Sequence, residues 1–194
     1  MEIEISGKGS GKNEIIELAE TLFRSKSEVK NVKENEISRV SQRMKELEGA
    51  YLAGVGRASS LAWFLFEKNK TEYALHLQTG FRVVTDENII FASADIFQSS
   101  DFLENSEEFD YDTFDWDIQE NSRYDERVDS FIDKYLNKLV VIGVFVSQYG
   151  DLTIKMNNGI EIEVFINMSK DECWRFFRRH SENHLIIGGD GIID

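Results

Sequence analysis

Two stretches of this chain repeat the same alternation of apolar and polar residues around a glycine, and this repeat constrains the fold more than any other feature. Aligning Gly80 with Gly159 places YALHLQTGFRV (73–83) on LTIKMNNGIEI (152–162), with apolar residues at every second position in both stretches. A period of two is typical of antiparallel strands that bury one face. The repeat therefore predicts two related β-meanders that form one sheet or a half-barrel.

The parity of the apolar positions also predicts the turns. A two-residue loop ending at Gly159 would split the apolar residues between the two faces of the hairpin. A three-residue loop over 157–159 instead pairs Met156 with Ile160 and keeps the apolar residues on one face. Such a loop needs its last residue in the left-handed region, which glycine supplies. The same arithmetic predicts a second hairpin loop over 78–80.

Helical periodicity replaces this alternation near the start of the chain. Apolar residues recur at threes and fours in two segments, and two amphipathic helices need an apolar surface to cover, which the strands supply. The helical positions are Ile15, Leu18, Ala19, Leu22 and Phe23, and then Ile37, Val40, Met44, Leu47 and Tyr51. We therefore expect one α+β domain over 1–194, with a helical part (1–52), a first meander (54–98), an acidic insert with one helix (101–137) and a second meander (139–194).

The chain is strongly acidic, with 36 Asp and Glu against 22 Lys and Arg and a net charge of −14. Such a surface repels nucleic acids and anionic membranes and attracts basic partners. No apolar run approaches the ~20 residues that span a bilayer, and the start MEIEISGKGS lacks the pattern of a secretory signal. The single Cys173 fits a reducing compartment. We therefore expect a cytoplasmic protein that binds neither nucleic acid nor membrane.

Most of the negative charge lies between the two predicted meanders. Residues 101–133 hold 13 acidic residues against only Arg123 and Arg127, a local balance of −11. The second half of this insert predicts a helix that Ser122 caps. Its apolar face is Val128, Phe131, Ile132, Tyr135 and Leu136. The first half, SEEFDYDTFDWDIQE, alternates acids with aromatics and has no helical face.

This acidic and aromatic stretch is the strongest candidate for a binding surface. Crowded carboxylates repel one another unless a cation relieves them, and aromatic side chains often anchor protein interfaces. The candidate residues are Glu107, Glu108, Asp110, Tyr111, Asp112, Phe114, Asp115, Trp116, Asp117 and Glu120. The alternative interpretation is a solvated loop or edge strand whose aromatics pack inward while its acids face water. As a calcium loop the stretch DYDTFDWD lacks the required glycine.

The glycine-rich turn at 7–12 is a candidate nucleotide site, because strand, glycine loop, lysine and helix together build a phosphate-binding loop. That loop has the pattern G-x-x-x-x-G-K-[ST]. Here Ser6 stands at the position of the first glycine and Asn13 at the position of the hydroxyl. The strands that follow are also antiparallel in pattern rather than parallel. We therefore predict a plain loop and a helix N-cap at Asn13.

Metal-binding and nucleophilic candidates are few. His180 and His184 are four residues apart in HSENH, but they fall between two strand patterns, which predicts a turn. With Cys173 nearby they still lack a further ligand for a metal. Cys173 itself is expected to be a buried thiol, and His76 a structural or surface residue on the polar face of its strand. No motif forms a catalytic constellation, so we expect a protein that is not an enzyme and has no cofactor.

A resemblance covers roughly residues 54–194. The run GRASSLAWFLFEKNKTEYALHLQTGFRV (56–83), followed by NGIEIEVF, ECWRFF and HLIIGGDGI, is similar to a group of small bacterial proteins. These share a GRA...L.W..F...YALH.Q..WR run and a later NG hairpin with an E.WR strand, and Phe81 stands here where their pattern has Trp. Many of them resemble immunity proteins of contact-dependent growth inhibition and related polymorphic toxin systems. The resemblance implies a protein that binds and silences a cognate toxin domain.

Charge and resemblance together predict an immunity protein, monomeric when free, that neutralises the C-terminal domain of a basic toxin through its acidic surface. A nuclease toxin has a basic substrate cleft that such a surface would cover, and opposite charge would speed the encounter. Two alternatives stay open. One is a regulatory binding module for a different basic partner. The other is an enzyme for a small cationic or sugar substrate, which an open apolar pocket with two carboxylates would favour.

Overall fold

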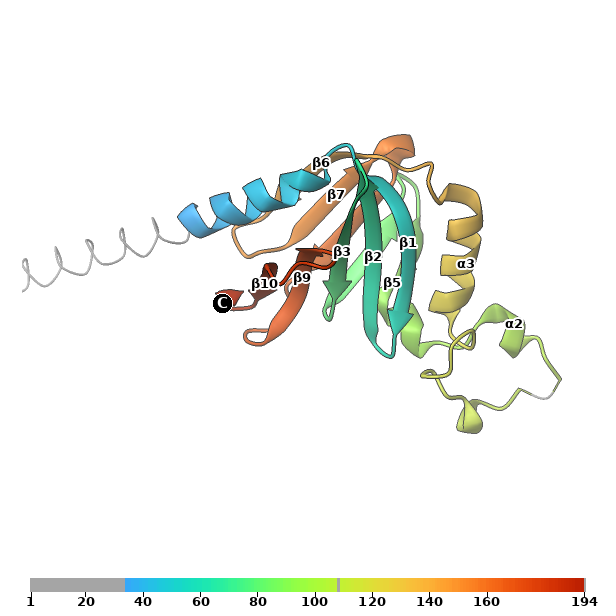
Figure 1. The fold of residues 1–194 in the computed structure, drawn as a ribbon. Helices are drawn as coiled ribbons and strands as arrows, with labels where there is room; N and C mark the ends of the chain where they lie inside the picture. Colours follow the sequence, from blue (N-terminus) through green and yellow to red (C-terminus); the bar gives the residue numbers. More distant parts are fainter. Residues whose placement is uncertain (1–33, 108, 194) are drawn as a thin grey trace, which may run out of the picture.

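The computed structural model describes residues 34–107 and 109–193 (Figure 1). The glycine-rich turn at 7–12, the helix expected over 13–23 and Glu108 lie outside the described residues. The fold is α+β, with two antiparallel sheets and few helices. Within the described residues, no helix is long and apolar enough to cross a membrane.

Six strands form sheet A and five form sheet B. Sheet A has the spatial order β1 (Tyr51–Ala58), β2 (Leu61–Lys68), β3 (Thr71–Leu77), β9 (Glu172–Arg178), β10 (His184–Gly188) and β11 (Gly191–Ile193). Sheet B has the order β5 (Ile89–Ala92), β4 (Gly80–Val84), β8 (Glu161–Phe165), β7 (Leu152–Met156) and β6 (Val141–Val146). The sequence predicted one sheet or a half-barrel. The structure has two sheets because the chain leaves sheet A after β3 and returns to it after β8.

The turn predicted over 157–159 is confirmed. The amide of Met156 donates to the carbonyl of Ile160 at 2.8 Å, and Gly159 has a φ of 68°. The following rung pairs Lys155 with Glu161, in the register that the apolar pattern requires. Local turn chemistry and burial agree here, because Met156 and Ile160 both face the core.

The hairpin predicted over 78–80 is wrong. β3 pairs with β2 and β9, whereas β4 pairs with β5 and β8, so residues 78–80 connect the two sheets instead of closing a hairpin. The Thr79 hydroxyl lies 2.5 Å from the carbonyl oxygen of Phe165 and 2.6 Å from Oδ1 of Asn167. These contacts tie the crossover to the end of β8, where the chain itself turns back toward sheet A.

The second N-terminal helix is present, but it ends earlier than predicted. Residues 34–44 are helical and continue into the short 3-10 helix η1 (Lys45–Leu47). Val40, Met44 and Leu47 are buried as expected. Tyr51 does not continue this face, because the chain turns at Gly49, with a φ of 82°, and Tyr51 opens β1 with half its surface exposed. Figure 1 shows this helix on the side of β6, β7 and β10.

The helix of the insert, α3 (Arg123–Tyr135), packs at the other end of the molecule. The amide of Asp125 donates to Oγ of Ser122 at 3.2 Å, which confirms the predicted cap. The buried face carries Tyr124 and Phe131, whose rings meet Phe91 edge to face at centroid distances of 5.4 and 5.3 Å. α3 thus rests on β5 and β1 and anchors the insert to the body (Figure 1).

Candidate functional site

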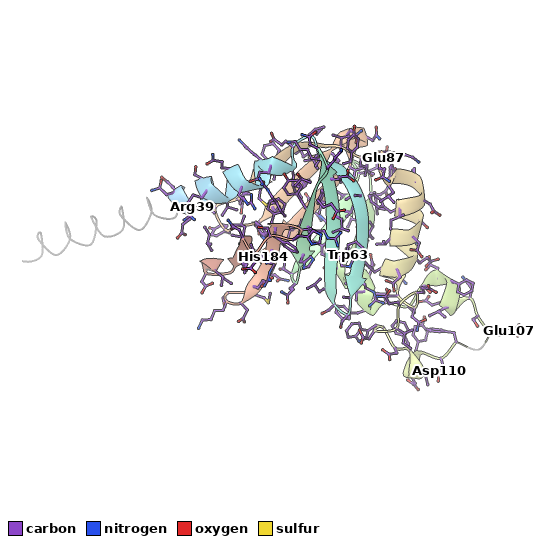
Figure 2. The ribbon with its side chains drawn as sticks, in the orientation of Figure 1. Arg39, Trp63, Glu87, Glu107, Asp110 and His184 are labelled. Atoms are coloured by element: carbon purple, nitrogen blue, oxygen red, sulfur yellow. The ribbon has the colours of Figure 1, made fainter. Side chains whose placement is uncertain are left out.

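The acidic insert follows η2 (Ser93–Phe97) and extends from the body beyond the start of α3. Its first half contains α2 (Asp101–Glu104) and η3 (Tyr111–Thr113). Figure 2 shows Glu107 and Asp110 at the far end of this extension. We call residues 107–120 the acidic tip. Nine of the ten predicted binding residues are described and lie on it together, and Glu108 is the one that is not.

The carboxylates of the tip point outward. All six described acids among the predicted residues are exposed: Glu107, Asp110, Asp112, Asp115, Asp117 and Glu120. Two of them shape the loop, since Oδ1 of Asp110 accepts from the amide of Asp112 and Oδ1 of Asp115 accepts from the amide of Asp117, both at 3.0 Å. Such side-chain turns hold the backbone without neutralising charge. In the part of the chain that the structure describes, none of these six forms an ion pair.

The aromatics of the tip pack mostly inward. Trp116 meets the ring of Phe97 at 4.9 Å and joins the edge of the core, while Phe114 meets Phe109 at 6.3 Å. Tyr111 also contacts Phe109, at 4.7 Å, yet it remains 69% exposed. The inward packing follows the alternative interpretation from the sequence, and Tyr111 is the predicted aromatic that stays available to a partner.

Two exposed apolar side chains of the insert were not among the predicted residues. Phe102 on α2 is 79% exposed, and Ile118 is 54% exposed. The exposure of Phe102 could have been predicted from the sequence, because no apolar residue lies three or four positions before or after it. Together with Tyr111 they add apolar surface to an otherwise carboxylate-rich region.

The acids at the root of the insert are paired, in contrast to those of the tip. Nη2 of Arg127 lies 3.1 Å from Oδ2 of Asp101, and Nη2 of Arg123 lies 3.5 Å from Oε1 of Glu104. The strong local charge that the sequence shows is therefore partly compensated where the insert joins the body. It is left uncompensated at the tip, which concentrates the negative potential there.

Arg57 holds the tip to the body, and sequence reasoning missed this residue. Its guanidinium is buried and donates Nε and Nη2 to the carboxylate of Asp125 at 2.7 and 2.6 Å. Nη2 also donates to the carbonyl of Ile118 at 3.1 Å. On the other side, Oδ2 of Asp125 accepts from the amide of Glu120 at 3.0 Å and from the hydroxyl of Ser122 at 2.9 Å. β1, the end of the tip and the start of α3 thus meet at one ion pair.

This ion pair shifts the pKa of both groups. Burial alone would raise the pKa of the Asp125 carboxyl, but the hydrogen bonds from Arg57 and Ser122 hold it below its usual value. The hydrogen bonds to Asp125 raise the pKa of Arg57. Both groups are therefore charged at neutral pH, and the pair acts as a permanent clamp.

The signal for Arg57 was in the motif GRA...L.W. The residue alternates with Val55 on the buried face of β1, where an arginine requires a partner. Gly56 faces the other side, and a Cβ there would overlap the ring of Trp63, its cross-strand partner on β2. Within the described residues this motif thus has structural tasks, which are to seat a tryptophan and to clamp the insert.

The other candidate residues from the sequence are spread over sheet A. His180 lies in a turn with a φ of 63°, whereas His184 begins β10 and stacks on Phe177 at 4.3 Å. Cys173 is fully buried in β9, which confirms the predicted thiol environment. His76 is half-buried and meets Phe177 edge to face at 5.0 Å. Among the described residues, no group of three or more His, Cys, Asp or Glu is placed to hold a metal ion.

Comparison with known proteins adds no relative to this picture. Neither a protein-family model nor a curated protein nor a solved structure matches the chain. The acidic tip and its attachment to the body are therefore the features that indicate a function.

Proposed function

We propose that this protein is an immunity protein that binds and neutralises a basic toxin domain, such as a nuclease, through the acidic tip. The observation that carries the proposal is the set of exposed carboxylates at residues 107–120, which have no ion-pair partner among the described residues. Like charges crowded on one projecting loop repel one another and destabilise the folded state. A cationic surface of a partner would relieve this repulsion on binding.

The attachment of the tip supports the same function. A loop that must be ordered on binding loses affinity to conformational entropy. Here the Arg57 and Asp125 pair fixes the end of the tip, and the contact of Trp116 with Phe97 fixes its middle. The carboxylates are therefore presented on a partly preorganised scaffold, which favours a defined partner over loose attraction of cations.

A basic nuclease cleft is the partner that suits this geometry best. Such a cleft binds phosphates, and spaced carboxylates on a projecting loop offer it the same charge. Tyr111 and Phe102 add exposed apolar anchors next to that charge, as protein interfaces require near their centre. In this proposal the protein acts in the cytoplasm and is a monomer when free.

We further infer that the two halves of the β structure are related repeats. The first half places β1, β2 and β3 in sheet A and then β4 and β5 in sheet B. The second half places β6, β7 and β8 in sheet B and then β9, β10 and β11 in sheet A. Each half is thus a three-strand meander followed by a crossover, and the acidic insert joins them. In this arrangement the insert is an addition to a symmetric body.

The proposal is tested by co-expressing the chain with the C-terminal fragment of the protein encoded just upstream, followed by a pull-down and a salt titration. A one-to-one complex with a basic domain is expected, weaker at high salt. The test variant changes Asp110, Asp112, Asp115 and Asp117 to Asn, which keeps the oxygen acceptors of the turns. It should fold normally, bind more weakly and lose most of the salt dependence.

A matched control removes four exposed acids from the body instead. The control substitutions are Glu67→Gln, Asp86→Asn, Glu87→Gln and Glu182→Gln. This variant has the same net charge as the test variant and should bind like the wild type. Equal loss of binding in both variants would mean that total charge, rather than the tip, attracts the partner. Full protection of cells by the test variant would remove the tip from the interface.

A further inference from the structure

A second concave site lies at the end of the molecule opposite the acidic tip. It is a cavity of about 430 Å³ between the helix at 34–44, the turn after β6, the segment that follows β8 and the turn between β10 and β11. In Figure 1 the helix and β10 lie on the side of the sheets away from α2. None of the residues that line the cavity belongs to the acidic insert. Its volume lies in the range of small-ligand sites.

The walls of the cavity are locked to one another by close backbone contacts. A Cβ on Gly189 would overlap the carbonyl of Met168, and one on Gly188 would overlap the carbonyl of Asp171. The segment after β8 therefore lies directly against the turn after β10. On a third wall, the buried Trp174 donates Nε1 to the carbonyl of Gly150 at 2.9 Å. These contacts require glycine at the two close approaches and preform the cavity.

The lining combines apolar side chains with two carboxylates. Its apolar part is supplied by Ile37, Val40, Ile166, Met168, Ile187 and Ile192. Glu36 and Asp190 supply the charge, and the described lining contains no Lys, Arg or His. Neither carboxylate has an ion pair or hydrogen bond within the described part of the chain.

Both carboxylates approach the same turn. Oε2 of Glu36 lies 3.6 Å from the position a Cβ would take on Gly191, and Oδ1 of Asp190 lies 3.2 Å from that position on Gly188. Two carboxylates at one cavity attract a cation, which would interact favourably with both. The apolar walls, in turn, need an apolar body to exclude water from them. A hydrated metal ion would satisfy the first requirement but not the second.

We propose that this cavity binds an organic cation on an apolar stem, that is, an alkylguanidinium or alkylammonium group. The charged head lies between Glu36 and Asp190, and the stem lies along Ile37, Met168 and Ile192. Tyr149, at the rim and largely exposed, offers a ring face to the same cation. This site is independent of the toxin-binding proposal, because none of its residues belongs to the insert.

The test uses the full-length, ¹⁵N-labelled chain and n-butylguanidinium as the probe, with n-butylurea as its neutral counterpart. Saturable shifts are expected at the amides of Gly150, Gly189 and Gly191, which line the cavity. The neutral probe should bind at least about tenfold more weakly, since it forms no charge-assisted hydrogen bonds. Equal binding of the two probes, or no saturable shift at these amides, would overturn the proposal.

Two double variants with the same change in net charge locate the site. Glu36→Gln with Asp190→Asn should weaken binding of n-butylguanidinium at least about tenfold, because both carboxylates are removed. Glu107→Gln with Asp112→Asn, at the tip, should leave it unchanged. Equal weakening in both variants would assign the binding to general charge attraction and refute the site. The spectrum of each free variant shows whether it keeps the wild-type fold.

The source of the cation is distinguished by a third probe, a short peptide with one arginine between two leucines. Binding at least tenfold tighter than n-butylguanidinium would assign the site to an arginine side chain of a protein partner. Equal binding of the two would assign it to a free small amine or guanidine. A fourfold Asp→Asn change at residues 110–117 should alter neither result, so failure of the toxin-binding proposal would be separately visible.

Discussion

The guanidinium of Arg57 and the carboxylate of Asp125 form a two-bonded ion pair, at 2.7 and 2.6 Å, between residues 68 positions apart in the chain. The arginine comes from the buried face of β1, and the aspartate from the first turn of α3. Because the same aspartate also accepts from Glu120 and Ser122, this pair couples the stability of the body to the position of the tip.

Replacing Arg57 with Ala is expected to lower the free energy of unfolding by about 3 kcal/mol, because Asp125 would keep a partly buried charge without its partner. Urea denaturation checks this value. Arg82→Ala is the matched control, since Arg82 pairs with Glu163 on an exposed face of sheet B. That change should cost less than about 1 kcal/mol. Similar losses in both variants would show that the buried pair has no special role.

The same pair predicts a defined pH dependence. The pKa of Asp125 is lowered in the folded state, so its contribution to stability is complete above the unfolded pKa of about 3.9. The contribution is lost as the pH falls through the lower, folded pKa. The difference in unfolding free energy between the wild type and Asp125→Asn should therefore be constant from about pH 5 to 7 and shrink below about pH 4. A difference that grows on acidification would contradict this assignment.

Asp129, one turn further along α3, should behave in the opposite way. Burial, together with repulsion from Asp125, Glu120 and Asp133, raises its pKa. Its charged form therefore destabilises the folded state at neutral pH. Asp129→Asn should stabilise the protein by a few tenths of a kcal/mol at pH 7, after allowance for solvent screening. The gain should disappear as the pH falls below the unfolded pKa, which parallel urea titrations at pH 7 and pH 3.5 would show.

How much of this could be predicted from sequence depends on whether the cause is local. The turn at 157–159 and the cap at Ser122 were predictable, because a glycine in the left-handed region and a serine before a helix act within a few residues. The loop at 78–80 has the same local pattern but connects two sheets. This loop cannot close a hairpin, because β9 pairs with the edge of β3 that β4 would otherwise occupy. β9 follows β3 by almost 100 residues, so the local sequence does not reveal this pairing.

The same distinction between local and distant causes applies to the candidate site. Exposure of the acids on the tip follows from their density in the sequence, and it was predicted. The ion pair of Arg57 with Asp125 was not predicted, because the sequence does not show which of the 13 acids in the insert Arg57 contacts. The cavity with Glu36 and Asp190 was not predictable from the sequence, since its walls combine the helix at 34–44 with three segments that follow it by more than 100 residues.

Gly56→Ala should destabilise the protein by about 1–3 kcal/mol, because the added methyl group would overlap the ring of Trp63. Thermal unfolding followed by tryptophan fluorescence measures both stability and the environment of the ring. Gly54→Ala is the control, because a Cβ there has its nearest contact at 3.3 Å, also with Trp63. A smaller loss is expected for it. Combining Gly56→Ala with Trp63→Leu should recover part of the loss, since the substitutions then compensate each other.

Tyr111→Ala tests the aromatic part of the proposed interface. Tyr111 is 69% exposed, so its removal should leave the unfolding free energy within about 0.5 kcal/mol of the wild type. If it anchors the toxin, the dissociation constant of the complex should rise by a factor of ten or more. Tyr149→Ala removes a tyrosine with almost the same exposure, 70%, at the opposite end of the molecule. Calorimetric titration of the toxin domain into both variants should show a loss for Tyr111 alone. An unchanged affinity in Tyr111→Ala would exclude Tyr111 as an anchor and leave the carboxylates and Phe102 as the proposed contacts.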